Sequence, residues 1–126
     1  MIEVGLVVTD LEASIRFYRD TLGLAHIGDL SLPGGEMRRF AHGDAVVKLL
    51  RFDDAPSTTS PGGPTPAVAG LRYLTLLVDD VVAAVDACTT AGFTIAIPTF
   101  QFARGVHVGI VEDPDGNWVE LVQRST

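Results

Sequence analysis

The sequence predicts an α+β fold made of two tandem βαβββ modules, and three observations support this prediction. Short stretches with a two-residue apolar alternation indicate strands, and apolar residues spaced three and four apart indicate two helices. The third observation is that this order occurs twice. The matching stretches are Val8-Thr9-Asp10-Leu11 with Val78-Asp79-Asp80-Val81, Gly23 with Gly92, and Val47-Lys48-Leu49 with Val119-Glu120-Leu121. Because neither module alone can bury a helix and both faces of a sheet, we expect curved mixed sheets that form a cup, with the helices on the outer face.

The first module spans about residues 1–52. An alternating strand at 2–8 leads into Thr9-Asp10-Leu11-Glu12, which has the spacing of a capping box. The helix that follows has an apolar stripe that ends at Gly23, a residue suited to a left-handed helix terminus. Strands are then expected at 24–32, 37–42 and 45–52, with turns at Pro33-Gly34-Gly35 and Gly43-Asp44.

A linker is expected at about 53–70, because its proline, glycine and serine content cannot form a core. The second module, at about 71–126, has a strand at 71–78, a helix at 81–91, and strands at 93–97 and 106–112. The tight turn Asp113-Pro114-Asp115-Gly116 leads into the last strand, which starts near Trp118. At 126 residues, the two modules together make a single domain.

Composition restricts the classes of function. A net charge of −7 without a basic cluster argues against nucleic acid or an anionic membrane surface as a partner. The apolar runs are too short to span a bilayer, and no signal peptide is visible at Met1. The single cysteine, Cys88, rules out an internal disulfide and fits a reducing compartment, so we expect a cytoplasmic protein.

The alternation of the central strands separates an aliphatic face, expected under the helices, from a concave face with isolated polar residues. Those polar residues are Glu3, Lys48, Tyr73 and Glu120, one on each central strand. A carboxylate in an apolar strand is costly unless it is paired, hydrogen-bonded or bound to a ligand. The four residues are therefore predicted to form a site.

Three groups of motifs carry a resemblance to a known family. They are Val4-Gly5-Leu6-Val7-Val8-Thr9-Asp10-Leu11 with Phe17-Tyr18-Arg19-Asp20-Thr21-Leu22-Gly23-Leu24; Leu74 to Val81; and Asp113-Pro114-Asp115-Gly116-Asn117 with Val119-Glu120-Leu121. With these motifs, nearly the whole chain resembles the vicinal-oxygen-chelate superfamily. That superfamily includes glyoxalase I, methylmalonyl-CoA epimerase, extradiol dioxygenases, fosfomycin-modifying enzymes and bleomycin-resistance proteins. The resemblance is specific for the fold and implies a homodimer, but it does not define the reaction, because one fold hosts many chemistries.

In metal-using members of this superfamily, each central strand supplies one His, Glu or Gln ligand to a divalent ion. The resemblance places these ligand positions at Glu3, Lys48, Tyr73 and Glu120. Only Glu120 has the usual identity, and a protonated lysine has no lone pair to donate and repels a divalent cation. His26, His42 and His107 lie elsewhere in the sequence. We therefore expect no metal cofactor; a metal-dependent alternative would use Glu3, Tyr73 and Glu120 as ligands.

We interpret Lys48 as standing in the place of the metal, paired with Glu3 and Glu120. In a catalytic version, Lys48 stabilises a developing oxyanion while Glu120 or Glu3 moves a proton. A purely structural ion pair is the alternative interpretation.

Aromatic residues are further candidates for ligand binding. Trp118 is suited to stacking on a flat ligand and Tyr73 to hydrogen-bonding it, although both could fill the cavity instead. Phe100 and Phe102 are expected in a loop before the seventh strand, as a mobile lid over the cup or as a contact with a second subunit.

Histidine and arginine supply the remaining candidates. His107 would face the cup if Val106, Val108 and Ile110 lie under the helix; a half-buried histidine bonded to its neighbours is the competing interpretation. Arg38 and His42 share a strand parity that suits the cup rim, or simply a solvated strand end.

Three functions follow from these residues. The preferred one is a metal-independent protein that binds an organic, aromatic or natural-product-like small molecule, for sequestration or for lyase- or isomerase-type acid–base chemistry. Whether the protein is an enzyme stays open. The second is a divalent-metal-dependent glyoxalase, epimerase or dioxygenase, and the third is an interaction module without a small ligand.

Overall fold

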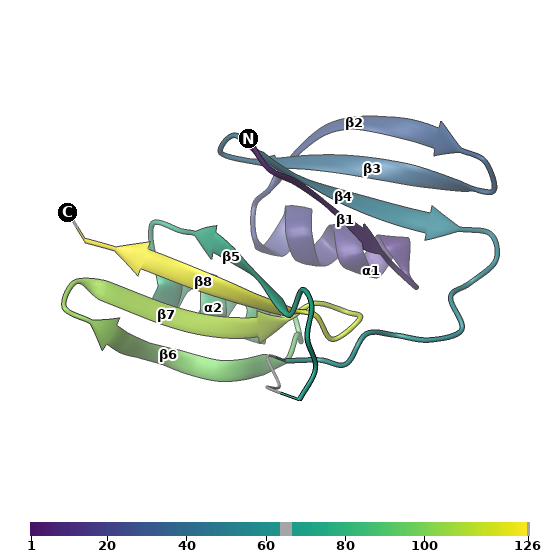
Figure 1. Ribbon diagram of the computed structural model, residues 1–126. Helices are drawn as coiled ribbons and strands as arrows, with labels where there is room; N and C mark the ends of the chain where they lie inside the picture. The colour runs from purple at the N-terminus through teal and green to yellow at the C-terminus, as the bar shows by residue number, and fades with distance from the viewer. Residues whose placement is uncertain (64–66, 126) are drawn as a thin grey trace. The chain divides into compact units, whose positions relative to one another are not determined.

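A computed structural model describes residues 1–63 and 67–125. The chain folds as two compact units, Met1–Thr59 and Ser60–Thr126. Each unit has a four-stranded sheet and a helical segment that lies along one face of its own sheet (Figure 1). The predicted α+β class and the tandem βαβββ order are confirmed. The division falls inside the expected linker, of which residues 64–66 lie outside the described residues, as does Thr126.

The first unit contains β1 (Glu3–Val7), α1 (Leu11–Ile15), η1 (Arg16–Thr21), β2 (Ala25–Leu32), β3 (Gly35–His42) and β4 (Ala45–Phe52). The sheet order is β1-β4-β3-β2, with β1 parallel to β4 and the other neighbours antiparallel. A two-residue turn at Gly43-Asp44 joins β3 to β4 and sets their register, in which His42 pairs with Ala45.

The second unit contains β5 (Tyr73–Leu77), α2 (Val81–Thr90), β6 (Ile95–Ala103), β7 (Val106–Glu112) and β8 (Trp118–Arg124). Its sheet order, β5-β8-β7-β6, repeats that of the first unit, again with one parallel pair, β5 with β8. Strand β6 extends six residues beyond the predicted strand at 93–97, which ended at Ile97. Within the described residues, no helix is long and apolar enough to cross a membrane.

The two helical segments begin alike and end differently. Asp10 and Asp80 cap them by accepting hydrogen bonds from the backbone N–H groups of Ala13 (3.1 Å) and Ala83 (3.0 Å). Gly23 follows its cap by 13 positions, whereas Gly92 follows its cap by 12. The extra residue is accommodated in η1, a π-helix in which the Leu22 N–H donates to the Phe17 carbonyl at 3.0 Å.

One face of each sheet packs against the helical segment of the same unit. In the first unit this face carries Phe40, Val47 and Leu49, all buried, as are Phe17 and Tyr18 of η1. In the second unit Val119 and Leu121 are fully buried with Val81 and Cys88 of α2. The predicted division into an aliphatic helix-covered face and an opposite open face is therefore correct for the central strands β4 and β8.

Candidate functional site

Strand pairing brings Lys48 and Glu3 to the open face of the first sheet. Lys48 in β4 pairs with Gly5 in β1 and with Arg39 in β3, and Glu3 pairs with Val46 two positions before Lys48. Paired residues share a face, so Lys48 and Arg39 point to the same side of the sheet as Glu3. Of these residues, Arg39 is one that the sequence reading did not single out.

The carboxylate of Glu3 has a different partner from the one expected. Its Oε1 lies 3.5 Å from Nη2 of Arg39, and both side chains are partly exposed. In the described part of the first unit, no carboxylate lies within ion-pair distance of Lys48. The expected pair of Lys48 with Glu3 is therefore wrong, because β3 supplies a second cation next to Glu3.

The open face of the second sheet carries Tyr73, Trp118 and Glu120. Tyr73 pairs with Trp118 in adjacent parallel strands, and Thr75 pairs with Glu120. The Thr75 hydroxyl donates a hydrogen bond of 2.9 Å to Oε1 of Glu120. This half-buried carboxylate thus has a neutral partner on its own sheet, and Thr75 is a second site residue that the sequence reading passed over.

Trp118 is held by contacts within its own unit. Its indole N–H donates to Oε1 of Glu112 at 3.2 Å. Gly63 has a φ of 74°, which favours glycine, and a Cβ added there would stand 3.1 Å from the indole ring. Gly63 is itself fixed by Arg72, whose Nη2 donates to its carbonyl at 2.8 Å. Gly63, within the expected linker at 53–70, is therefore buried against Trp118, whereas described linker residues such as Asp53 and Gly70 are exposed.

His107 lies on the helix-covered face of the second sheet, and its expected placement is corrected. It pairs with Gln123, whose side chain accepts a hydrogen bond from the Val81 N–H at the start of α2 (2.9 Å). The alternate residues of β7, Val108 and Ile110, lie on the opposite face of the sheet, where they form a buried cluster with Val122. Nδ1 of His107 is buried and has no hydrogen-bond partner among the described residues.

The reason for this arrangement is Gly109, the next residue on the helix-covered face after His107. A Cβ at Gly109 would lie 2.7 Å from Cγ2 of Val85, so α2 can approach β7 only where a side chain is missing. The condition under which His107 would face the cup, with Val106, Val108 and Ile110 under the helix, is therefore not met. Steric room, rather than hydrophobicity, decides which set of residues faces α2.

Phe100 and Phe102 belong to a strand, which contradicts the expected loop. Both lie in β6, where Phe100 pairs with Val108, and the turn to β7 contains only Arg104 and Gly105. Phe102 is 72% exposed and Phe100 is 41% exposed. A flexible lid at 100–105 is therefore ruled out, and the two rings are side chains of a paired edge strand.

Arg38 and His42 lie on the face opposite Lys48, because they alternate with Arg39 and Ala41. Arg38 forms ion pairs with Glu36 (2.8 Å) and Asp29 (3.6 Å). Nearby, ion pairing of Arg51 with Glu36 and Asp53 raises the pKa of the Arg51 guanidinium. Of the two alternatives for Arg38 and His42, the position at the cup rim is therefore excluded.

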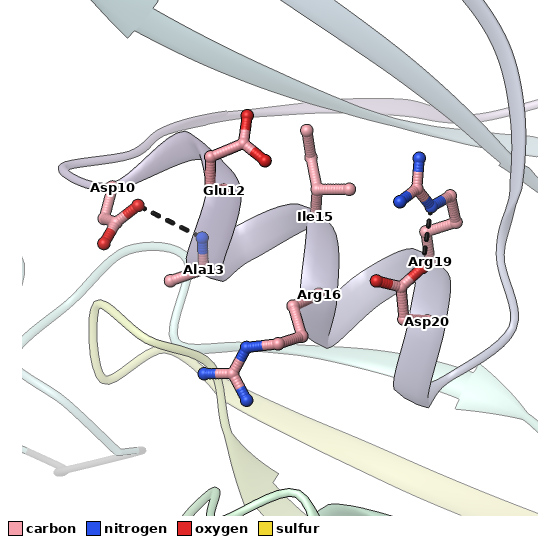
Figure 2. A pocket seen from close by; sticks show the side chains of 7 residues that line it. All are labelled: Asp10, Glu12, Ala13, Ile15, Arg16, Arg19 and Asp20. Atoms are coloured by element: carbon pink, nitrogen blue, oxygen red, sulfur yellow. Dashed lines mark hydrogen bonds and ion pairs between the residues drawn. The ribbon is translucent and has the colours of Figure 1, made fainter.

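A pocket also runs along the exposed side of α1 and η1 (Figure 2). It is lined by Asp10, Glu12, Ala13, Ile15, Arg16, Arg19 and Asp20. Its polar groups are largely satisfied: Asp10 caps the helix, and Arg19 donates to Asp20 at 2.7 Å, which lowers the pKa of the Asp20 carboxyl. None of the predicted site residues lines this pocket.

The residues at the ligand positions implied by the superfamily do not suit a divalent metal ion. Of the two ligand positions in the first unit, only Glu3 carries a carboxylate, which already lies near the Arg39 guanidinium, and Lys48 adds a second positive charge on the same face. Each of these two positive charges would repel a divalent ion held within a few ångströms of it. Over residues 1–63 and 67–125, no three His, Cys, Asp or Glu side chains are gathered as metal ligands, so neither unit alone provides a ligand set.

The fold and these motifs define a tandem βαβββ protein, and comparison with known proteins identifies its family. Residues 1–121 match the glyoxalase/bleomycin resistance protein/dioxygenase superfamily, and the chain belongs to it. The resemblance stated from the sequence is therefore confirmed.

Several relatives match the chain over most of its length. The uncharacterized protein YwbC of Bacillus subtilis is 30% identical, with 95% of this chain and 94% of that protein covered. A probable lactoylglutathione lyase of Vibrio parahaemolyticus is 29% identical, with 94% and 86% covered. A crystal structure of a glyoxalase family protein from Bacillus cereus has a TM-score of 0.85 at 18% identity, covering 100% of this chain and 94% of that one. Glyoxalase I from Zea mays has a TM-score of 0.82 at 20% identity, and this chain covers 45% of its length.

Proposed function

We propose that the protein is a metal-independent member of its superfamily that binds an organic small molecule at the open faces of its sheets. Lys48 and Glu120 are the polar groups assigned to the ligand. The observation that carries the proposal is the cationic pair Lys48 and Arg39 on the open face of the first sheet, where Lys48 stands at one of the ligand positions that the superfamily implies. Around this pair the strands are apolar, which suits an organic molecule.

The pattern of charges supports a role for Lys48 as an electrophilic group. An ammonium ion stabilises negative charge on a ligand oxygen, as a metal ion does, without requiring ligand lone pairs from the protein. Lys48 has no carboxylate partner in the described part of its own unit, so its donors are free to serve a ligand there.

Glu120 supplies the complementary group. The hydrogen bond from Thr75 fixes one carboxylate oxygen and leaves the other able to accept a proton or a ligand donor. In a catalytic version, Glu120 moves a proton while Lys48 stabilises the oxyanion, with Glu3 as the alternative base. In sequestration the same groups hold an unreacting ligand, with Tyr73 and Trp118 beside Glu120.

The first test is metal content. Protein purified without chelators is analysed for Zn, Mn, Fe, Ni and Mg, and thermal shifts are recorded after each metal is added. The proposal predicts no stoichiometric ion and no stabilisation. One tightly held ion per chain would contradict the proposal. Such an ion would also raise the thermal unfolding temperature, because a ligand that binds the folded state stabilises it by mass action. Lys48→Met provides the control, since removing its charge should make any weak metal binding stronger.

A second function is favoured by one comparison, the probable lactoylglutathione lyase of Vibrio parahaemolyticus at 29% identity. In that case the chain would hold a divalent metal with Glu3, Tyr73 and Glu120. The test is an assay of lactoylglutathione formation with and without added divalent metals. Metal-dependent turnover that is lost in Glu120→Gln would establish this function in place of the first.

The assembly and compartment belong to the same proposal. We expect a homodimer in the cytoplasm, without nucleic acid or membrane partners. Light scattering on the purified chain measures the assembly directly, and a monomer at all concentrations would contradict this expectation.

A further inference from the structure

We propose that the open face of the first sheet is an anion subsite that takes a carboxylate of an organic ligand between Lys48 and Arg39. The inference rests on the proposed function, because it names the chemical group that this small-molecule site recognises. It starts from one feature of the sheet: two cationic side chains stand directly opposite each other in adjacent antiparallel strands.

Such an arrangement is unfavourable in an isolated sheet. Directly paired residues have Cβ atoms roughly 5 Å apart, and like charges at this distance destabilise the pairing. One carboxylate is nearby, Glu3, which lies 3.5 Å from Arg39. It offsets one of the two charges, so the face keeps an excess of one positive charge. A local rule broken without full compensation within the sheet is typical of a site where a ligand provides the rest.

The surroundings of the pair select the kind of anion. On the other side of Lys48, its neighbour in β1 is Gly5, which has no side chain to shield the ammonium group. Along the open face, the positions before and after Lys48 are Val46 and Leu50, and those beside Arg39 are Met37 and Ala41. Two cations framed by aliphatic groups suit an anionic head on an apolar body. A strongly hydrated inorganic anion would gain nothing from this frame.

The two cationic side chains bind a carboxylate in different ways. The planar guanidinium of Arg39 presents paired N–H donors that match the two oxygens of a carboxylate. The Lys48 ammonium is a compact charge that can approach one of those oxygens. Because Glu3 engages one nitrogen of Arg39, the remaining donors of the fork are available for the ligand.

The sequence allows a direct observation of this subsite, because Lys48 is the only lysine in the chain. Protein labelled with carbon-13 lysine gives a single side-chain εCH2 signal. The full chain is titrated with two matched probe pairs, naphthoate with naphthamide and cinnamate with cinnamamide. Each pair differs in charge and hardly in shape. We expect both carboxylates to shift the lysine signal and to bind about tenfold more tightly than their amides.

Three variants locate the effect. Lys48→Met and Arg39→Met should each weaken naphthoate binding about tenfold and leave naphthamide binding unchanged. Arg38→Met is the matched control, because it removes the same charge one residue away on the opposite face of the sheet. It should leave naphthoate binding within about twofold of the unchanged protein. Backbone amide spectra of all three variants show whether the fold is kept, and binding is compared only among folded variants.

The contrary results are equally specific. The anion subsite would be overturned if the carboxylates and the amides bound with equal affinity. It would also be overturned if the variants Lys48→Met and Arg39→Met bound naphthoate as well as Arg38→Met does. The failure of both carboxylates to bind would overturn it as well. Equal affinity would leave small-molecule binding itself standing. The metal-independent function fails on a different result, a stoichiometric metal ion.

Discussion

The two units of this protein share a scaffold and carry opposite charge at its centre. Both sheets have one parallel and two antiparallel pairings in the same order, and both helical segments begin at an aspartate cap. By strand register, the position of Lys48 in the first unit is that of Glu120 in the second. The neighbouring positions also differ: Glu3 corresponds to Tyr73, Gly5 to Thr75, and Arg39 to Ile110.

The comparison shows that the two units share the positions of their side chains but not the residue types at those positions. The backbone places alternate residues of each central strand on the open face, and these positions are free to diverge because they do not contact the helix-covered core. The core positions show the opposite behaviour, since Leu49 and Leu121 occupy equivalent places and are both fully buried. The chemistry of the superfamily can therefore change without changing the fold.

The largest expected effect tests whether the two cores are equivalent. Leu49→Ala and Leu121→Ala should each lower the free energy of unfolding by about 2–5 kcal/mol, because each leaves a cavity in a closely packed core. Denaturant unfolding measures the loss, and hydrogen exchange shows whether each substitution loosens only its own unit. A loss below about 1 kcal/mol in one unit alone would break the comparison between the cores.

A smaller effect tests how closely the helices approach their sheets. Gly109→Ala should destabilise the protein by about 1–3 kcal/mol, because the new methyl group would overlap Cγ2 of Val85 at 2.7 Å. The equivalent position in the first unit is Arg38, the partner of Leu49 as Gly109 is of Leu121. Arg38→Ala removes only partly exposed ion pairs and should cost less than about 1 kcal/mol. Thermal unfolding compares the two, and equal losses would contradict the close approach of α2.

The caps give an effect of about 1 kcal/mol in each unit. Asp10→Ala should destabilise more than Asp80→Ala, because α2 keeps a second hydrogen bond at its start, from the Val81 N–H to Gln123. Removing both Asp80 and Gln123 should eliminate this advantage. Urea unfolding of the three variants measures it, and a larger loss in Asp80→Ala than in Asp10→Ala would contradict the role of Gln123.

Much of the fold was predictable because the sequence repeats. The aspartate caps, the glycines after the helices and the alternation of the strands predicted the element order. The π-helix was not predicted, although the extra residue between Asp10 and Gly23 is visible in the spacing. A one-residue difference has several structural solutions, and the sequence alone does not choose among them.

The site was predicted less completely, for two physical reasons. The turn at Gly43-Asp44 already sets the register that places Arg39 beside Lys48, so this residue could have been found by counting back from the turn. For β7 no such argument was available from hydrophobicity, since both faces of the strand are buried. The decisive residue was Gly109, whose missing side chain admits the helix and turns His107 toward it.

A pH effect is expected at Cys88, whose place in α2 corresponds to that of Tyr18 when both helices are aligned at their caps. Both side chains are fully buried. Burial raises the pKa of the Cys88 thiol from 9.0 to about 11, because the thiolate would lose its hydration. Folding therefore favours the neutral thiol, and this contribution to stability is complete below pH 9 and is lost as the pH rises toward 11.

Two measurements follow from that shift. A thiol reagent at neutral pH should modify the folded protein only as fast as it opens, and modify the unfolded chain at once. Between the two pKa values, the unfolding free energy should fall with pH more steeply in the unchanged protein than in Cys88→Ala, since only the former loses a thiol proton on unfolding. Rapid modification of folded protein would mean that Cys88 is accessible, and that the second unit packs its helix less tightly at this position than the first.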